Sequence, residues 1–262
     1  MTAPASHQPP GRYRFRHLAR MEWIKLRSLR STWITLALTV IAPAGIALAT
    51  GGCNTTSGGT FVSNTLTGML IGVLLTGVAG VLAMTGEYTS GTISATFAAA
   101  PRRPRVLTAK AAVIGAAALV TGEAAAFLSF FAGGMTLRHG ITAPALSQPG
   151  VLRAIVLTGA SLSLIAVFGL GLGAIIRHTA AAITVIVGIV FVGGTFIGQS
   201  DFAIRPYLPL YIVSHSLGAT GPACLPGMAS CWLSPWSGLG LLAGYAAIAM
   251  LLGGLIPARR DA

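Results

Sequence analysis

Between Arg30 and Glu87 the sequence contains no charged residue, and this stretch constrains the fold more than any other feature. A membrane-spanning helix needs about 20 apolar residues, so the stretch is long enough for two spans. Residues 51–60, rich in Gly, Thr, Ser and Asn, separate its apolar halves as a loop would. Only 8% of the chain is charged, whereas soluble globular domains carry about 25%. The pattern therefore predicts an integral membrane protein and excludes a soluble domain.

The same reasoning along the rest of the chain predicts six membrane-spanning helices. An apolar run in lipid has to satisfy its own backbone hydrogen bonds, so each run is expected to be an α-helix. The predicted spans cover residues 33–49, 66–84, 111–133, 155–176, 180–198 and 239–257. The expected fold class is all-α: a single polytopic transmembrane domain over residues 16–262, preceded by a disordered basic tail over residues 1–15.

The positive charges predict which side of the membrane each loop occupies. With six spans, fourteen of the 17 Lys and Arg residues lie in the two terminal segments and in the second and fourth loops. The opposite side carries only Arg138, Arg153 and Arg205. Because cytoplasmic loops are enriched in Lys and Arg, we expect a multi-pass protein of the cell membrane with both termini in the cytoplasm. A five-span count would separate the termini and break this partition.

The net charge of +12 also raises the possibility of nucleic-acid binding, which the position of the charges argues against. Seven of the positive residues precede the first span, and no nucleic-acid recognition fold accompanies them. A basic segment that leads into an apolar span is expected to contact anionic membrane lipid. We therefore expect membrane lipid as a partner and no nucleic acid.

The predicted outer side contains two sequence features that bear on processing: a cleavage-like tripeptide and three cysteines. Ala47-Leu48-Ala49 resembles a signal-peptide cleavage site, but the long basic region before it favours an uncleaved first span. Cys53, Cys224 and Cys231 all fall on the predicted outer side, where disulfides persist. Cys224 and Cys231 enclose a short Pro/Gly loop and could form a disulfide. In the alternative, they are small loop residues that do not pair.

The residues that carry chemistry are few, so catalysis by this chain is not expected. The acids are Glu22, Glu87, Glu123, Asp201 and Asp261, and only Glu123 lies within a predicted span. Neither a GxSxG nor an HExxH pattern occurs, and no spacing resembles a metal site.

A phosphate-binding loop is excluded as well. This motif needs a Lys followed by Ser or Thr, but Lys25 precedes Leu26 and Lys110 precedes Ala111. No other lysine is present. Any ATP-driven work therefore requires a partner that binds the ATP and Mg, and no cofactor is expected in this chain.

Glu123 has two interpretations. A carboxyl group midway along a span is costly in lipid and is by default a candidate functional acid, contacting substrate or a neighbouring helix. In the alternative, the group is protonated, bonded to a local backbone or hydroxyl group, and faces the protein interior.

Four pairs of glycines follow the small-xxx-small spacing that lets helices approach closely in lipid. They are Gly68/Gly72, Gly169/Gly173, Gly194/Gly198 and Gly240/Gly244. The pairs predict helix packing, within one chain or between two, and say little about function.

Two cytoplasmic segments carry most of the functional signal. Residues 16–33 combine Leu18, Met21 and Ile24 at helical spacing with basic residues, which predicts an amphipathic helix along the inner membrane surface. Residues 86–110 follow the second span and combine an acid, a Thr-Ser-Gly-Thr run and a Pro/Arg turn. Ser and Thr are plausible caps for a short helix in this loop, and Pro101 would end it.

The second segment, E-Y-x-x-G-T followed by P-x-x-x-R and a Lys, resembles the cytoplasmic loop of type-2 ABC transporter permeases. The first, E-W-x-K-L-R-S-x-R-S-T-W, is similar to the interfacial helix of actinobacterial members. The resemblance implies a permease that dimerises, as a homodimer or heterodimer, and pairs with separate ABC ATPase subunits. It places the ATPase-coupling interface, including a coupling helix between spans two and three, at Glu22, Lys25, Arg27, Glu87, Tyr88, Gly91, Thr92, Pro101, Arg102, Arg103 and Arg105.

The sequence departs from the family pattern in one segment, and the resemblance implies one further structural element. Residues 97–100, Phe-Ala-Ala-Ala, are smaller than the Leu-rich stretch common in the family, which puts the detailed contact surface in doubt. Residues 203–235, with five prolines, are a candidate for the family's re-entrant hairpin before the last span.

The leading hypothesis is therefore the permease subunit of an ABC exporter that moves a small amphipathic or drug-like substrate. The alternative is a polytopic membrane immunity, sensor or assembly protein that works without an ATPase. The presence of a partner with a phosphate-binding loop would distinguish the two.

Overall fold

The computed structural model describes residues 15–28, 30–51, 58–91, 103–137, 143–197, 204–216 and 233–260. Within these ranges the chain is helical and contains no strand, which confirms the all-α prediction for the described residues. The elements are α1 (Phe15–Ser28), α2 (Arg30–Gly51), α3 (Gly58–Leu66), α4 (Met69–Thr89), α6 (Arg103–Met135), α7 (Val151–Ile176), α8 (Thr179–Val187), the π-helix η1 (Gly188–Ile197), the 3₁₀-helix η2 (Arg205–Tyr207), α9 (Pro209–Ser216) and α10 (Pro235–Arg260).

In the part of the chain that the structure describes, five helical segments are long and apolar enough to cross a membrane. They are Arg30–Thr50, Phe61–Thr89, Arg105–Met135, Val151–Ile176 and Pro235–Leu255, and each contains most of one predicted span. The fifth predicted span, residues 180–198, corresponds to α8 followed by η1, whose apolar part Thr179–Gly193 is shorter than the others. The structure thus supports a membrane-embedded protein whose described part has five helices able to span a membrane, and the predicted span over residues 180–198 stays a prediction.

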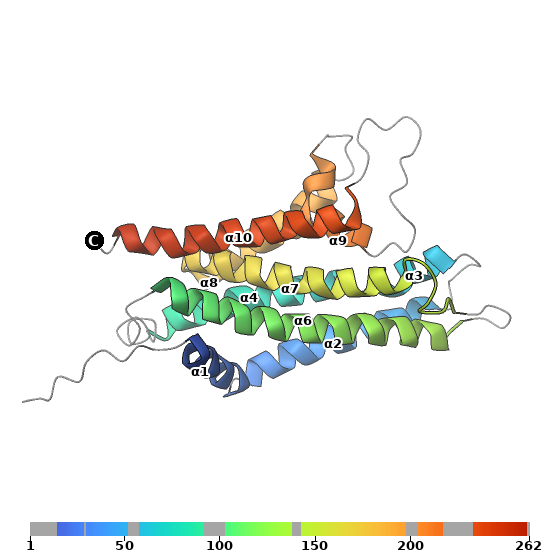
Figure 1. Ribbon diagram of the computed structural model, residues 1–262, viewed down its shortest axis with the longest axis horizontal. Coiled ribbons are helices and arrows are strands. Elements are labelled where there is room, and N and C mark those ends of the chain that lie inside the picture. Colours follow the sequence, from blue (N-terminus) through green and yellow to red (C-terminus); the bar gives the residue numbers. More distant parts are fainter. Residues whose placement is uncertain are drawn as a thin grey trace, which may run out of the picture.

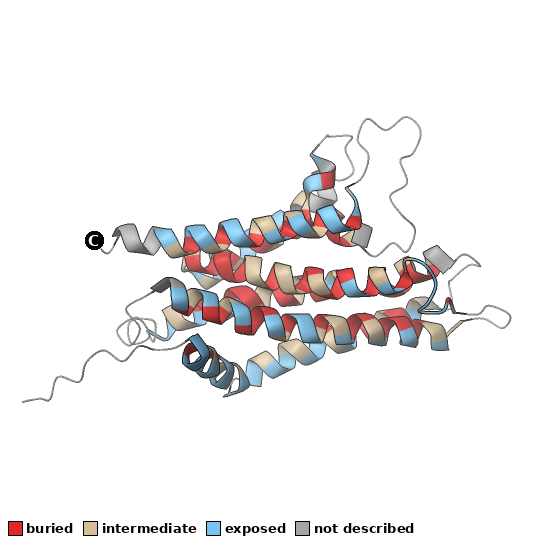
Figure 2. Ribbon diagram, viewed as in Figure 1, coloured by how far each residue is buried: buried red, intermediate tan, exposed pale blue. Residues whose placement is uncertain are grey.

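The long helices form an elongated bundle with α7 near its centre (Figure 1). Helix α7 packs against α4, α6 and α10, while α2 packs along α6 and α4. The burial pattern agrees, because α7 is largely buried whereas α2 and α10 carry exposed residues along one side (Figure 2). Helix α1 and the C-terminus lie at the same end of the bundle, which we call the α1 end.

The exposed sides of the long helices are apolar. Val120 is 69% exposed, Leu251 65% and Ile41 64%, and they lie on three different helices. Soluble monomers rarely expose apolar surface on this scale, whereas helices in lipid do so over their whole outer face. The exposed surface is therefore consistent with a bilayer as the surrounding solvent.

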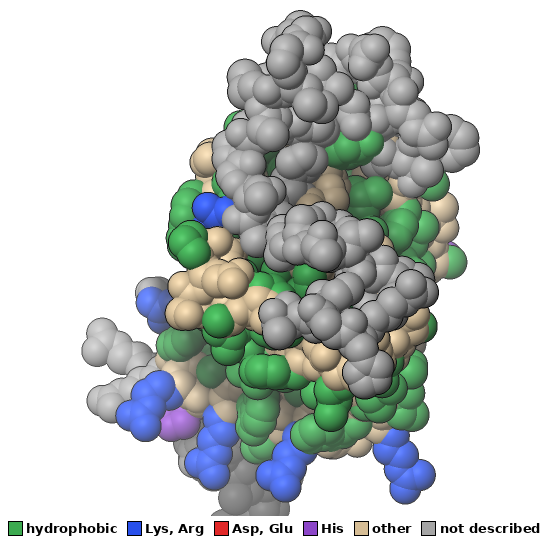
Figure 3. Space-filling model, turned by 90° about the vertical axis from the view of Figure 1, so that its right-hand side faces the viewer, with side chains coloured by type: hydrophobic (Ala, Val, Ile, Leu, Met, Phe, Trp, Pro, Cys, Tyr) green, Lys and Arg blue, Asp and Glu red, His purple; other side chains and the backbone are tan. Residues whose placement is uncertain are grey.

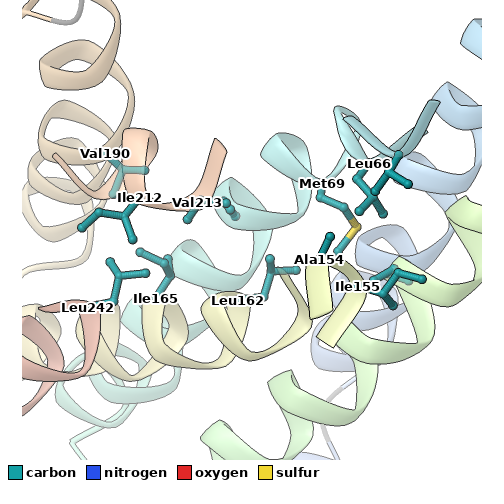
Figure 4. Packing of buried hydrophobic residues seen from close by; sticks show 14 of the residues in the cluster. Leu66, Met69, Ala154, Ile155, Leu162, Ile165, Val190, Ile212, Val213 and Leu242 are labelled. Carbon is teal, nitrogen blue, oxygen red and sulfur yellow. The ribbon is translucent and has the colours of Figure 1, made fainter. Parts of the chain in front are cut away.

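The short elements before α10 pack into the bundle. Ile212 and Val213 of α9 are buried, and they join one core cluster with Val190 of η1 and Leu242 of α10 (Figure 4). The same cluster includes Ile155, Leu162 and Ile165 of α7. Within the predicted re-entrant stretch, the described part is thus a packed helix, and residues 217–232 lie outside the described residues.

The predicted amphipathic segment 16–33 is two helices rather than one. Helix α1 ends at Ser28 and α2 begins at Arg30, so Trp33 belongs to the first long span. The indole Nε1 of Trp33 donates a hydrogen bond to the carbonyl oxygen of Arg27, 3.0 Å away, across this junction. The apolar residues of α1 also divide between two sides, since Leu18 is buried whereas Met21 and Ile24 are exposed.

Two of the four predicted glycine pairs pack closely within the chain. A Cβ atom added to Gly68 would lie 2.9 Å from the backbone of Pro43, and one on Gly72 would lie 3.0 Å from Leu162. Gly169 and Gly173 meet α4 in the same way. Gly240 and Gly244 have no atom within 4 Å of an added Cβ, and the packing of Gly194 and Gly198 lies outside the described residues.

Candidate functional site

Helix α1 is fixed to the bundle by a small apolar contact. Leu18, which is 5% exposed, packs against Val106 and Ala109 on the first turns of α6. Leu26, further along α1, packs against a second cluster formed by α4, α6 and α7. These contacts place one side of α1 against the ends of α4 and α6. The charged residues on that side of α1 therefore lie next to those two helices.

Four charged side chains from three helices meet beside this apolar contact, and we call them the charge cluster: Glu22 and Lys25 of α1, Glu87 of α4 and Lys110 of α6. The Nζ atom of Lys110 lies 2.6 Å from Oε2 of Glu22 and 2.8 Å from Oε1 of Glu87. The Nζ atom of Lys25 lies 3.0 Å from Oε1 of Glu22 and 2.8 Å from the same Oε1 of Glu87. Each ammonium group therefore bridges both carboxylates.

The charge cluster is neutral and largely removed from solvent. Glu22 is 5% exposed and Lys110 is 4% exposed, whereas the side chain of Lys25 remains 38% exposed. Lys110 also donates to the carbonyl oxygen of Ala83 at 3.4 Å, so all three of its N–H donors have acceptors. Buried ions are tolerated when they are paired and fully hydrogen-bonded, which this arrangement provides.

Lys25 stays charged at neutral pH within the cluster. Its burial alone would lower the pKa, but hydrogen bonds to Glu87 and Glu22 outweigh this effect and raise the pKa above the ordinary value of 10.5. The stabilisation by Lys25 is therefore fully present below pH 10.5 and is lost only as the pH rises through the raised pKa.

The Lys25→Met variant tests the contribution of the more exposed of the two lysines in the charge cluster. Because the side chain is 38% exposed, water replaces part of the lost interaction, so we expect the free energy of unfolding to fall by about 1 kcal/mol or less. Thermal unfolding in detergent solution measures this loss. A loss as large as that of a Lys110 variant would contradict the assignment of Lys110 as the buried centre of the cluster.

The remaining described residues of the predicted coupling interface lie around the cluster. Tyr88 lies next to Glu87, and its ring contacts the guanidinium group of Arg177, which is 5.6 Å from the ring centroid. Gly91 has a positive φ of 69° just after the end of α4. Arg27 and Arg105 are exposed. Lys and Arg side chains project along the lower margin of Figure 3, at the level of α1 in Figure 1.

Several predicted site residues cannot be placed. Thr92, Pro101 and Arg102, and with them the predicted coupling helix, lie outside the described residues, as do Cys224 and Cys231. Arg103 is the first residue of α6, but its side chain is not among those described. The basic tail over residues 1–15 is likewise outside, except for Phe15.

Lys110 was not among the predicted interface residues, although the rarity of lysine in this chain is a signal for it. Lys25 and Lys110 are the only lysines in the chain, and both belong to the charge cluster. An acid or a lysine at the edge of an apolar span is costly unless it has a partner. Two acids and two lysines at three such edges therefore indicate mutual pairing. Arg177, which stacks on Tyr88, had no comparable signal.

Glu123 lies apart from the charge cluster, in the middle of α6. Its carboxyl group lies against Gly159 of α7, where an added Cβ would be 2.5 Å from the carboxyl carbon. The Oε2 atom is buried and has no hydrogen-bond partner within the described part of the chain. The alternative in which a local group satisfies the carboxyl is therefore not seen for this oxygen atom.

The described residues contain no group of three or more His, Cys, Asp or Glu side chains that could hold a metal ion. Neither a protein-family model nor a curated protein matches this sequence. The charge cluster joins α1 to α4 and α6 through ion pairs.

Proposed function

We propose that this chain is the transmembrane permease subunit of an ABC exporter in the cell membrane, with both termini in the cytoplasm. A separate ATPase subunit would hydrolyse ATP, and a second permease subunit would complete the translocation path. The substrate would be a small amphipathic molecule. The observation that carries this proposal is the charge cluster, which joins α1 to the ends of α4 and α6.

The charge cluster supports the proposal because it couples the position of α1 to the positions of α4 and α6. Glu22 bridges to α6 through Lys110, and Lys25 bridges to α4 through Glu87. Buried, multiply bonded ion pairs keep their geometry better than exposed ones. A partner that displaces α1 would therefore move the ends of both spans together, as ATP-driven transport requires.

This geometry separates two roles within the predicted coupling interface. Glu22 is buried and paired, so it would transmit motion rather than touch the ATPase. The surface that a partner would meet is the outer side of α1, where Trp23 is 52% exposed and Arg27 is also exposed. Exposed Trp and Arg side chains are the residue types that most often anchor protein interfaces.

Co-purification tests the proposal. We expect the tagged chain, extracted from its native membrane, to retain an ATPase with a phosphate-binding loop. The double variant Trp23→Ala/Arg27→Ala is expected to lose roughly tenfold or more of this ATPase, equivalent to about 1.4 kcal/mol of binding. Trp236→Ala is the matched control, because Trp236 is 65% exposed at the start of α10, away from the α1 end.

Two results would count against this function. Absence of any co-purified ATPase would favour a sensor, immunity or assembly protein that works without one. An ATPase whose retention is equally reduced by Trp236→Ala would show that the outer side of α1 is not the specific contact. ATP-dependent accumulation of an amphipathic dye in inverted membrane vesicles then measures transport itself.

A further inference from the structure

Glu123 is the one acid of the described residues that lies at membrane depth without a counter-charge. Glu22 and Glu87, the other two described acids, belong to the charge cluster. At 1.5 Å per residue, Glu123 lies about 27 Å along α6 from Arg105 and about 18 Å from Met135. The apolar core of a bilayer is about 30 Å thick, so this position is well inside it.

The neighbouring helix is shaped around this carboxyl group. A Cβ on Gly159 would lie 2.5 Å from the carboxyl carbon and 2.6 Å from Oε1 of Glu123, so only glycine leaves room for the group. Next to it, an added Cβ on Gly122 would lie 2.8 Å from the Gly159 carbonyl oxygen. The two helices thus touch backbone to backbone here, and the carboxyl group fills the space beside the contact.

The carboxyl group also lies near the outer surface of the bundle. Glu123 is half-buried, while Val120, three residues earlier on the same side of α6, is 69% exposed. On α7, Val156 precedes Gly159 by three residues and is 39% exposed. The site therefore borders the apolar surface that would face lipid, at the seam between α6 and α7.

We propose that Glu123 is the binding site for a cationic amphiphile, such as a lipophilic ammonium or phosphonium ion, that enters from the bilayer. An ionised carboxylate at this depth is costly unless a positive charge accompanies it. The described residues form no ion pair with Glu123, whereas a cation with an apolar body would supply the charge and match the apolar surroundings. The assignment of this ligand as the exported substrate rests on the proposed function; the binding itself does not.

Equilibrium binding of tetraphenylphosphonium to the purified full-length chain in lipid nanodiscs tests the site. Binding is expected to be saturable, and Glu123→Gln should weaken it by roughly tenfold or more, whereas Glu123→Asp should retain part of it. Asp261→Asn is the matched control, because it removes an acid outside the predicted spans and outside the charge cluster. Equal affinity of the wild type and Glu123→Gln would overturn the proposal.

A second measurement keeps the test independent of how the variants fold. Dicyclohexylcarbodiimide modifies carboxyl groups in apolar sites, and mass spectrometry locates the product on Glu123. We expect tetraphenylphosphonium to slow this modification and the neutral triphenylphosphine oxide to leave it unchanged. Equal protection by both compounds, or by neither, would overturn the proposal.

These measurements contain no ATPase, so they separate the two proposals. Charge-dependent binding without ATP-driven export would support the site and count against the transporter function. ATP-driven export together with an unchanged affinity for tetraphenylphosphonium in Glu123→Gln would support the transporter function and count against the site.

Discussion

Replacing Lys110 with methionine is expected to lower the free energy of unfolding by about 3–5 kcal/mol, among the largest single-residue effects in this protein. Methionine preserves much of the side-chain volume but removes the charge. Glu22, only 5% exposed, would then keep Lys25 as its single cation, and Lys25 is itself 38% exposed. A buried charge that has lost its main partner is costly, because water cannot replace the interaction.

Thermal unfolding in detergent solution measures this loss against a matched control. Arg105→Met removes a cation from the same helix at an exposed position, so its effect is expected within about 0.5 kcal/mol. The double variant Glu22→Gln/Lys110→Met should lower the free energy of unfolding by less than the sum of the two single changes. Each single change leaves a buried charge without its partner, whereas the double change removes both charges. Equal effects of Lys110→Met and Arg105→Met would show that the charge cluster does not stabilise the fold.

The positions of the long helices were predictable because charges are rare and lie near the ends of apolar runs. The helices extend beyond the predicted spans at the α1 end, where α4 continues past Glu87 and α6 begins before Lys110. The prediction assumed that a charge ends a span. In the structure the helices continue through these two residues, which form an ion pair at 2.8 Å.

The charge cluster was only partly predictable. The family resemblance implied that Glu22, Lys25 and Glu87 belong to one interface, whereas composition indicated only that the few acids and lysines would pair, without the helix packing that brings Glu22 to Lys110. Glu22 and Lys110 are 88 positions apart, and the packing of α1 through Leu18 and Leu26 brings them together. Periodicity within one helix contains no information about such a partner.

Span five and the surroundings of Glu123 were beyond sequence reasoning for a different reason. Residues 180–198 are uniformly apolar, so nothing in their composition predicts the change from α-helix to π-helix at Gly188. Glu123 was identified as unusual, but its contact with Gly159 depends on how α6 crosses α7. Gly159 does not belong to any of the predicted glycine pairs.

Replacing Gly80 with alanine should be the most damaging single-methyl change in the bundle. In an ordinary helix this change stabilises by up to about 1 kcal/mol, because glycine is a poor helix former. Here the added Cβ would overlap the carbonyl oxygen of Ala166 on α7 and lie 2.8 Å from its carbonyl carbon. These are backbone atoms, so no rotamer change relieves the overlap and the two helices have to separate.

The expected result is a loss of about 1–3 kcal/mol or more in the free energy of unfolding, opposite in sign to the intrinsic preference. Gly45→Ala on α2 and Gly240→Ala on α10 are the controls, since an added Cβ at either position meets no atom within 4 Å. Both should be neutral or slightly stabilising when thermal unfolding is measured in the same detergent. If Gly80→Ala behaves like these controls, α4 and α7 do not meet backbone to backbone, and the central contact of the bundle would have to be revised. If Gly240→Ala lowers the free energy of unfolding while Gly45→Ala does not, a second molecule packs on that face of α10.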